Sequence, residues 1–361
     1  MKSAAGIEWV LSTCVSLRRS QAKTLSRLTL AALDLARATI GELGRSLSRQ
    51  TSIAAKHSIK RVDRFIGNCR VEPILAMGDV VRWLVRPRKR LLVSLDWVDI
   101  RDLHVIVLAA RLGGRAIPLL WAAYRQQSLF RSQNNIEYGL LRALRTYVPE
   151  STQVVILADR GFGRAEMARV CQELGFCYVI RIDPDVHIRH RDFTGKLLDL
   201  PVRRGYRKVF RNVSYRKTNP VEQHVAVIWL QGQSEPWFLM TNVEKVPAAR
   251  LTRIYGHRMS IEEYFRDQKS KRNGFAMRLN LIRDPRRLER MLLVLALAYI
   301  LLVAVGLEAL KKFGPHWWCS NSRKGECSLF TIGRTMLYYI SPGKPSQLNR
   351  LRTQLLKGNW G

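Results

Sequence analysis

Two aspartates follow apolar, β-branched stretches in a chain where acidic residues are scarce. The 361 residues include 61 Lys and Arg but only 28 Asp and Glu. Asp96 lies in VSLDWVD and Asp159 in VVILADRGF, each at the end of a predicted strand, where α/β sheets place their sites. Carboxylate oxygens are the ligands that hard cations such as Mg²⁺ prefer. The alternative for either Asp is an ordinary turn or helix cap.

A third carboxylate belongs to the segment IYGHRMSIEEYFRDQK. We expect residues 251–269 to form one helix, on which Tyr255, Arg258, Glu262 and Lys269 fall within about 60° of one another. One face would then carry a phenol, a guanidinium, a carboxylate and an ammonium, which suits a metal ion beside a phosphate. A solvated charged face is the alternative interpretation.

These four residues match the Y-x2-R-x3-E-x6-K signature in type and spacing. The chain therefore resembles the insertion-sequence-four family of DDE transposases, over roughly residues 20–310. Asp96 and Asp159 resemble the first two catalytic aspartates of that family, in the same order and strand context. The resemblance implies an α/β fold: an RNase H-like catalytic domain with a β-strand-rich insertion and an N-terminal helical DNA-binding domain.

The resemblance also implies a metal-dependent reaction. Asp96, Asp159 and Glu262 would be catalytic and would bind two Mg²⁺ ions per active site, which Mn²⁺ can replace. Two ions about 4 Å apart stabilise the attacking and leaving oxygens of an in-line phosphoryl displacement. Water would first free a 3′-hydroxyl, which then becomes the nucleophile. We exclude the neighbouring Glu263 as a ligand because it lies about 100° around the helix from Glu262.

The family likewise suggests which residues contact DNA. Arg258 would clamp a phosphate, while Tyr255 and Lys269 would hold neighbouring phosphates. The segment EPWFLMTN resembles the family segment that places a Trp near the transposon end, so Trp237 would stack on a flipped base during hairpin formation; core packing is the alternative. Met259 is a departure, because some relatives carry a Trp there to hold a displaced base, and a thioether packs on a base more weakly.

The surrounding pattern describes the regions that must position these residues. We expect a helical basic DNA-binding domain (1–88), the first part of the catalytic core (89–183), a β-rich insertion (184–248), the C-terminal helices of the core (249–313) and a basic tail (314–361). The first part of the core has the predicted order βββαβαβ, with a turn at Gly113–Gly114. We assign no role to the tail.

Apolar periodicity gives the individual elements. The expected strands cover residues 91–95, 103–110, 116–123, 153–158, 177–182, 206–210, 224–230 and 237–241. The expected helices cover residues 26–47, 52–67, 135–147, 163–174, 251–269 and 285–312. The helix at 52–67 carries a basic face formed by Lys56, Lys60, Arg61 and Arg64, which we predict to bind DNA.

Charge supports a polyanionic partner. Residues 1–90 contain 18 basic and 6 acidic residues, and the whole chain has a net charge of +33. DNA, RNA and anionic membranes are the candidate partners. For the N-terminal region a merely solvated basic face is the alternative. The unbroken apolar run at 291–305 is shorter than the ~20 residues of a membrane span, so we expect a buried core helix; a membrane-associated basic protein is the alternative.

The cysteines and the N-terminus indicate where the protein works. The six cysteines are scattered without a CxxC pair, which is typical of reduced thiols, and we see no secretory signal. We expect a cytoplasmic, nucleoid-associated bacterial protein with no membrane partner.

Taken together, these features favour the transposase of a bacterial insertion sequence. It would bind terminal inverted repeats and catalyse cut-and-paste transposition by DNA cleavage and strand transfer, acting on double-stranded DNA of the transposon ends and the target. A homodimer in a synaptic complex is the expected assembly. The alternative is a catalytically inactive, DNA-binding relative, against which the intact acidic triad argues.

Overall fold

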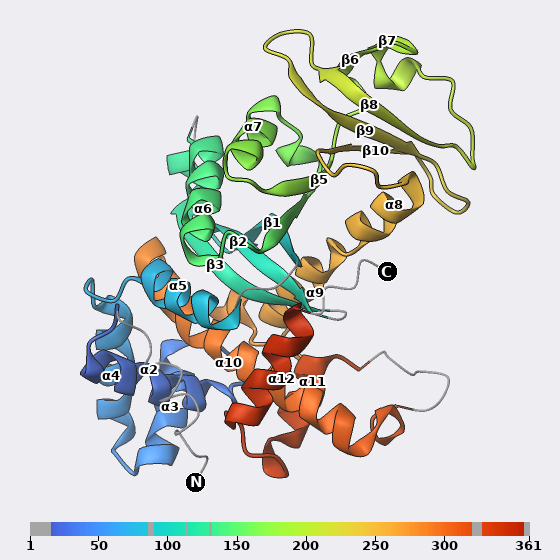
Figure 1. Ribbon diagram of the computed structural model, residues 1–361. Coiled ribbons are helices and arrows are strands. Elements are labelled where there is room, and N and C mark those ends of the chain that lie inside the picture. Colours follow the sequence, from blue (N-terminus) through green and yellow to red (C-terminus); the bar gives the residue numbers. More distant parts are fainter. Residues whose placement is uncertain (1–15, 86–89, 113–114, 130–131, 320–326, 357–361) are drawn as a thin grey trace.

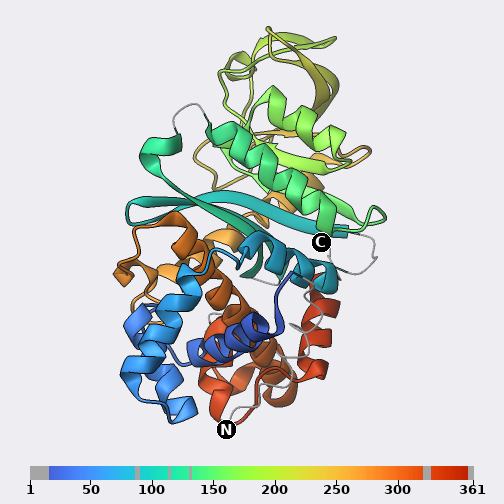
Figure 2. The same ribbon diagram turned by 90° about the vertical axis from the view of Figure 1, so that its left-hand side faces the viewer.

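A mixed sheet of ten strands, with helices on both faces, organises the computed structural model shown in Figures 1 and 2. The structure describes residues 16–85, 90–112, 115–129, 132–319 and 327–356. The expected turn at Gly113–Gly114 and the expected boundary near residue 88 lie outside these ranges.

The strands occur in the spatial order β3-β2-β1-β4-β5-β10-β9-β8-β6-β7. Their bounds are β1 (Arg90–Ile100), β2 (Leu103–Leu112), β3 (Arg115–Arg125), β4 (Gln153–Ala158), β5 (Cys177–Arg181), β6 (His187–His190), β7 (Phe193–Lys196), β8 (Arg207–Tyr215), β9 (Val221–Ile228) and β10 (Trp237–Thr241).

The helices fall into an N-terminal group, a group around the sheet, and a C-terminal group. Their bounds are α2 (Arg19–Ala32), α3 (Ile40–Thr51), α4 (Ala55–Gly67), α5 (Pro73–Leu84), α6 (Gln133–Tyr147), α7 (Ala165–Glu173), α8 (Ala248–Gly256), α9 (Met259–Lys269), α10 (Pro285–Phe313), α11 (Leu329–Thr335) and α12 (Pro345–Leu356).

The first five strands confirm the predicted order βββαβαβ. β1 pairs antiparallel with β2, and β2 pairs antiparallel with β3. β1 pairs parallel with β4, which pairs parallel with β5. The apolar stretch at 153–158 is a central strand with the predicted bounds, because parallel strands are covered on both faces and favour continuous Val, Ile and Leu.

Alternate residues of these strands enter two different hydrophobic clusters. Val93 and Ile156 belong to the cluster that contains residues of α6 and α7. Leu92 and Leu157 belong to the cluster that contains residues of α8. Successive side chains of a strand point to opposite faces, so α6 and α7 cover one face and α8 covers the other, with α9 packed against β1 beside it.

The insertion extends this sheet. β10 pairs antiparallel with both β5 and β9, and β8, β6 and β7 follow outward. The strand expected at 237–241 has the predicted bounds, whereas β6 and β7 were not predicted because their four-residue runs are too short for a clear alternation.

The helix α10 lies at the centre of the helical layer and packs against helices of both the N-terminal and the C-terminal groups. It is the one helix among the described residues that is long and apolar enough to cross a membrane, yet 89% of its most apolar stretch is buried inside the protein. This burial supports the predicted core helix. Contact between α10 and α11 is close: a Cβ on Gly306 would lie 2.1 Å from the Leu329 carbonyl oxygen, and one on Gly333 would lie 1.9 Å from that of Leu302.

One expectation about the helical layer is corrected, and the tail contains helices for which no prediction was made. The helix predicted at 26–47 is two helices, because residues 33–39 leave the helical path although Leu33, Leu35 and Ala38 stay buried. The N–H of Ala38 donates to the Phe275 carbonyl instead of continuing a helix. The tail contains α11 and α12, which were not predicted.

Candidate active site

Asp96 lies inside β1 and not at its end, which corrects the predicted position. β1 continues to Ile100 through its pairing with β2, where Asp96 faces Val107. The parallel pairing with β4 stops earlier, at Ser94 and Leu157. Counting two residues on from that pair places Asp96 level with Asp159, at the carboxyl end of β4.

Asp159 also serves as a helix cap, as the alternative interpretation expected. Its Oδ1 accepts a hydrogen bond of 3.0 Å from the Gly161 N–H, at the start of a 3₁₀ turn at Arg160–Phe162. This bond fixes the carboxylate but uses only one of its oxygens. Capping and metal binding are therefore compatible at this position.

The predicted single helix at 251–269 is two helices, α8 and α9, joined at His257 and Arg258. The N–H groups of these two residues donate to carbonyls three residues back, at Ile254 and Tyr255. Gly256 precedes the junction and weakens helical continuity there. Arg258 keeps helical backbone angles, φ −54° and ψ −37°, so the chain continues in a helical sense through the junction.

The Arg258 guanidinium bridges two of the proposed ligands. Its Nη1 lies 3.4 Å from Asp96 Oδ2, and its Nη2 lies 2.5 Å from Glu262 Oε1. The Arg258 and Asp96 side chains are 13% and 17% exposed, whereas Glu262 is 41% exposed. The fold thus brings Asp96 of β1 and Glu262 of α9 together around the Arg258 guanidinium.

The pKa of Asp96 is shifted by burial and by the charged groups around it. The pKa of Asp96 is raised to about 6: burial is the main cause, Arg258 opposes the rise, and the nearby charges of Asp159 and Glu262 add to it. All three proposed ligands therefore interact electrostatically at one place. Among the residues that the structure describes, no three His, Cys, Asp or Glu side chains form a ready-made metal cluster. The oxygen donors nevertheless suit Mg²⁺, and a cation there would offset the burial and repulsion that raise the pKa of Asp96.

Tyr255 and Trp237 extend the site toward the insertion. Their rings meet edge to face with centroids 5.1 Å apart, and the Arg181 guanidinium lies over Trp237 at 5.9 Å. Burial is the main cause of the raised pKa of Tyr255, and the nearby Arg258 opposes the rise. Trp237 is half-buried beside the α8 cluster, so it combines core contacts with some exposure.

Lys269 and Met259 complete the signature region. Burial and the nearby Arg278 lower the pKa of Lys269, while Asp99 and Asp96 oppose this shift. Lys269 therefore lies within electrostatic range of one proposed ligand, Asp96. Met259 is 51% exposed, and its Sδ lies 3.7 Å from Arg258 Nη2.

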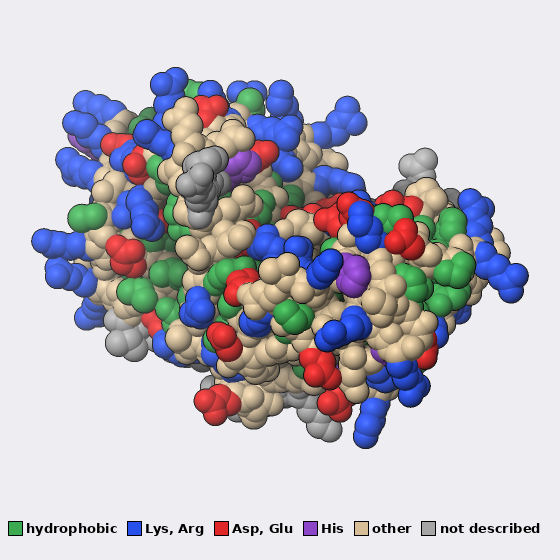
Figure 3. Space-filling view, turned by 90° about the horizontal axis from the view of Figure 1, so that it is seen from above, with side chains coloured by type: hydrophobic (Ala, Val, Ile, Leu, Met, Phe, Trp, Pro, Cys, Tyr) green, Lys and Arg blue, Asp and Glu red, His purple; other side chains and the backbone are tan. Residues whose placement is uncertain are grey.

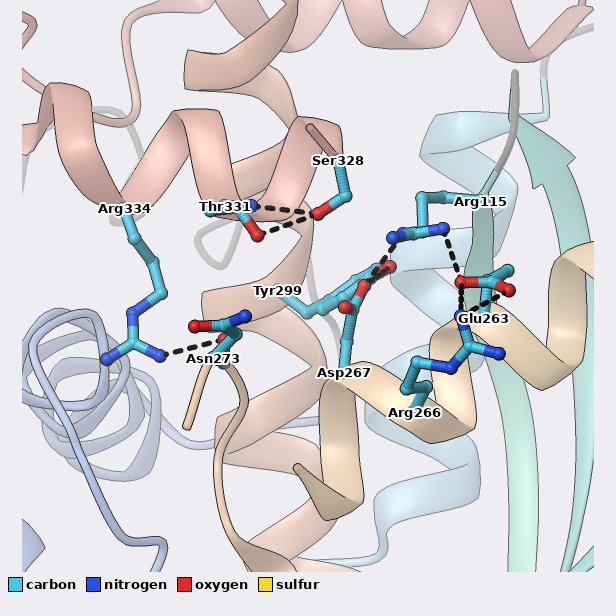
Figure 4. A network of polar contacts seen from close by, with 9 residues as sticks. All are labelled: Arg115, Glu263, Arg266, Asp267, Asn273, Tyr299, Ser328, Thr331 and Arg334. Atoms are coloured by element: carbon cyan, nitrogen blue, oxygen red, sulfur yellow. Dashed lines mark hydrogen bonds and ion pairs between the residues drawn. The ribbon is translucent and has the colours of Figure 1, made fainter. Parts of the chain in front are cut away.

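A polar network fixes α9 from behind, and sequence reasoning missed it. Arg115 of β3 forms ion pairs with Glu263 (2.9 Å) and Asp267 (3.0 Å) of α9, and Tyr299 of α10 donates to Asp267 at 3.0 Å. Figure 4 shows Arg115 reaching between the two carboxylates. Burial raises the pKa of Asp267 to about 6, although Arg115 and Tyr299 oppose the rise. Glu263 is thus one of the acids that pair with Arg115 in this network.

The predicted basic residues of the N-terminal region lie along α4. Lys56, Lys60 and Arg64 are exposed, and Arg61 is half-buried. A cleft of about 360 Å³ opens between α2 and α4; it is lined by Ser20, Gln21, Thr24, His57, Lys60, Arg61, Arg64, Phe65 and Asn68. Hydroxyl, amide and cationic groups together suit a phosphate backbone.

Basic side chains are also abundant elsewhere on the surface. Figure 3 shows Lys and Arg spread over the face seen from above. In the insertion, five exposed basic residues lie close in sequence: Arg203, Arg204, Arg207, Lys208 and Arg211. This distribution agrees with a polyanionic partner.

Comparison with known proteins bears on the same region. Residues 132–301 match the family described as Transposase DDE domain; no match is found among curated proteins. The matched range contains Asp159 and Glu262, whereas Asp96 lies before it. Proteins with this domain are nucleases and transferases of DNA that use divalent metals. The match supports a DDE transposase.

Proposed function

We propose that the protein is the transposase of a bacterial insertion sequence, of the insertion-sequence-four type. It binds terminal inverted repeats and catalyses cleavage and transfer of DNA strands, with a hairpin during excision. The observation that carries this proposal is the Arg258 bridge between Asp96 and Glu262 beside Asp159. A second candidate, a catalytically inactive DNA-binding relative, would have no need for three carboxylates at one place.

The proposed metal ligands are Asp96, Asp159 and Glu262. Mg²⁺ ions bound there, with Mn²⁺ as a substitute, would stabilise the attacking and leaving oxygens of a phosphoryl displacement. Arg258 can exchange a carboxylate for a DNA phosphate, since both offer acceptors that fit its planar fork. The guanidinium then positions the strand while the carboxylates are released.

The remaining parts have proposed roles around this centre. The βββαβαβ order supports an RNase H-like core, and the basic helices α2–α5 form the proposed DNA-binding domain. Tyr255 and Lys269 hold neighbouring phosphates of the same strand. We further propose a homodimer in a synaptic complex, working at the bacterial nucleoid in the cytoplasm.

Cleavage of the DNA that flanks its own gene tests the proposed function. The full chain should nick DNA carrying the element's ends in Mg²⁺ or Mn²⁺ and should be inactive with a chelator. The same DNA with its ends scrambled is the control. Binding without metal-dependent cleavage would favour the inactive relative.

Charge reversal on α4 tests the proposed DNA-binding surface. Lys60→Glu combined with Arg64→Glu should weaken binding to end DNA by about 10- to 100-fold at low salt. Each lost phosphate contact should lower the log–log salt slope by about 0.9. Deletion of residues 1–88 is a poor test, because α2–α5 share one hydrophobic core with α10.

The matched control carries the same charge change elsewhere. Lys311→Glu with Lys312→Glu alters two exposed lysines at the end of α10 and should change affinity less. Equal losses in both double variants would show that only net charge matters and would remove α4 from the interface.

Trp237→Ala tests the proposed stacking on a flipped base. First-strand nicking should stay near normal, and hairpin formation should slow by about 10- to 100-fold, since one base stack contributes about 1–3 kcal/mol. Gel analysis of nicked and hairpin products measures both steps. Trp229→Ala, at another half-buried Trp of the insertion, is the control. Joint loss of thermal stability and nicking would assign Trp237 to the core.

A further inference from the structure

Glu137 of α6 is a fully buried acid, 0% exposed. Its Oε1 accepts a hydrogen bond of 2.9 Å from the Trp97 indole Nε1, and its Oε2 forms an ion pair with Arg164. A buried carboxylate is costly unless it is paired and hydrogen-bonded. Both of its oxygens have partners in the fold.

Each partner of Glu137 is tied to one of the two proposed aspartate ligands. The backbone N–H of Trp97 donates to Asp96 Oδ1 at 2.8 Å. Arg164 Nη1 donates to the Gly161 carbonyl at 2.5 Å, and the Gly161 N–H donates to Asp159 Oδ1 at 3.0 Å. An unbroken series of contacts thus runs from Asp96 through Glu137 to Asp159.

This series of contacts lies where the backbone pairing between β1 and β4 has ended. The paired ladder between β1 and β4 ends at Ser94 and Leu157, two residues before each aspartate. The β1–β4 register brings Asp96 and Asp159 level, but the ladder of backbone hydrogen bonds stops short of both residues. Trp97 points to the α6 face, because it alternates with Asp96 on the strand, so Glu137 acts from behind the sheet.

We propose that Glu137 is a positioning residue that fixes the separation of Asp96 and Asp159 for cation binding. The inference rests on the proposed function of those aspartates. In this role Glu137 is not itself a metal ligand; it acts through Trp97 and Arg164. Outer groups of this kind change metal affinity by about 10- to 100-fold when they are lost.

Glu137→Gln is the direct variant. The amide keeps the size of the side chain, but it offers one acceptor where two donors, the indole N–H and the guanidinium, converge. One arm of the series must then break. Glu289→Gln is the matched control, since Glu289 is also a buried acid, 4% exposed, bound to the Ala123 N–H at 2.8 Å and to Arg286 at 3.1 Å.

Two readouts separate positioning from folding. Water-proton relaxation measures Mn²⁺ binding to the full chain, and nicking of end DNA is measured against Mn²⁺ concentration. Glu137→Gln should raise both half-saturating Mn²⁺ concentrations by about 10- to 100-fold, with nicking restored at high Mn²⁺. Glu289→Gln should lower thermal stability without shifting either concentration.

Further outcomes decide the proposal. If Glu137→Gln does not fold, Trp97→Phe, which removes the indole donor and keeps an aromatic ring, must show the weakened Mn²⁺ binding. Unchanged Mn²⁺ binding in a folded Glu137→Gln protein overturns the inference while leaving the proposed function intact. Wild-type protein whose Mn²⁺ binding does not depend on Asp96 overturns the proposed function and the inference with it.

Discussion

Replacement of Asp96, Asp159 or Glu262 by Ala, one at a time, is expected to abolish metal-dependent nicking and to leave DNA binding intact. A catalytic cation supplies several kcal/mol of charge stabilisation in the transition state, so the rate should fall on the order of 10³-fold or more. Nicking of end DNA and a mobility-shift assay measure the two activities separately.

Asp96 allows the catalytic role to be separated from a structural one. Its pKa in the fold, about 6, lies above the ordinary value of 3.8. Its contribution to stability is therefore present below about pH 4 and is lost as the pH rises through about 6. This rise corresponds to about 3 kcal/mol at most. Asp96→Asn, neutral at every pH, should be as stable as the wild type or more stable at pH 7.5 while remaining inactive.

The neighbouring Asp99 provides the control for this series. Its side chain is 65% exposed and pairs with His104, so Asp99→Ala should keep most of the nicking activity. Full nicking by any of the three triad variants would remove that residue from the site. Loss of stability in Asp96→Asn at neutral pH would instead indicate a structural ion pair with Arg258.

The sequence was most informative where the structure of a segment depends mainly on its own residues. The apolar run before Asp159 and the alternating run around Trp237 became strands with the predicted bounds. The spacing of Arg258 and Glu262, one helical turn apart, likewise predicted that they share a face, and they are in contact.

The break between α8 and α9 shows where periodicity stops being sufficient. Residues 254, 261 and 265 keep an apolar stripe through the junction, so the pattern reads as one helix. The backbone instead tightens at His257 and Arg258, the residue whose guanidinium lies 3.4 Å from Asp96. A sequence pattern averages over such local shifts.

The supporting ion pairs could not be predicted because their partners are distant in sequence. Glu137 was visible as a lone acid on the apolar face of α6, among Leu140, Leu141 and Leu144. That signal marks a buried charge, but it does not identify Trp97 or Arg164 as its partners. The packing of α6 beside β1 and the start of α7 brings these residues together.

Arg115→Met is expected to destabilise the protein by about 3–5 kcal/mol, because it leaves the buried carboxylates of Glu263 and Asp267 without their cationic partner. The Arg115 side chain is 16% exposed, and those of Glu263 and Asp267 are 27% and 8% exposed. Both acids belong to α9, which carries Glu262, so the helix that presents the third proposed ligand should also loosen. Chemical unfolding measures the loss, and the double variant with Asp267→Asn should recover part of it by removing one stranded charge.

The pH dependence gives this prediction its sharpest form. Arg115 holds the pKa of Asp267 down against burial, so Arg115→Met should raise it above about 6. A carboxyl group whose pKa is raised in the fold loses its stabilising contribution as the pH rises through that value. The deficit of Arg115→Met should therefore be larger at pH 8 than at pH 5, where Asp267 is largely protonated in both proteins. A deficit that is equal at the two pH values would mean that Arg115 contributes packing alone, and that α9 is positioned by its apolar contacts.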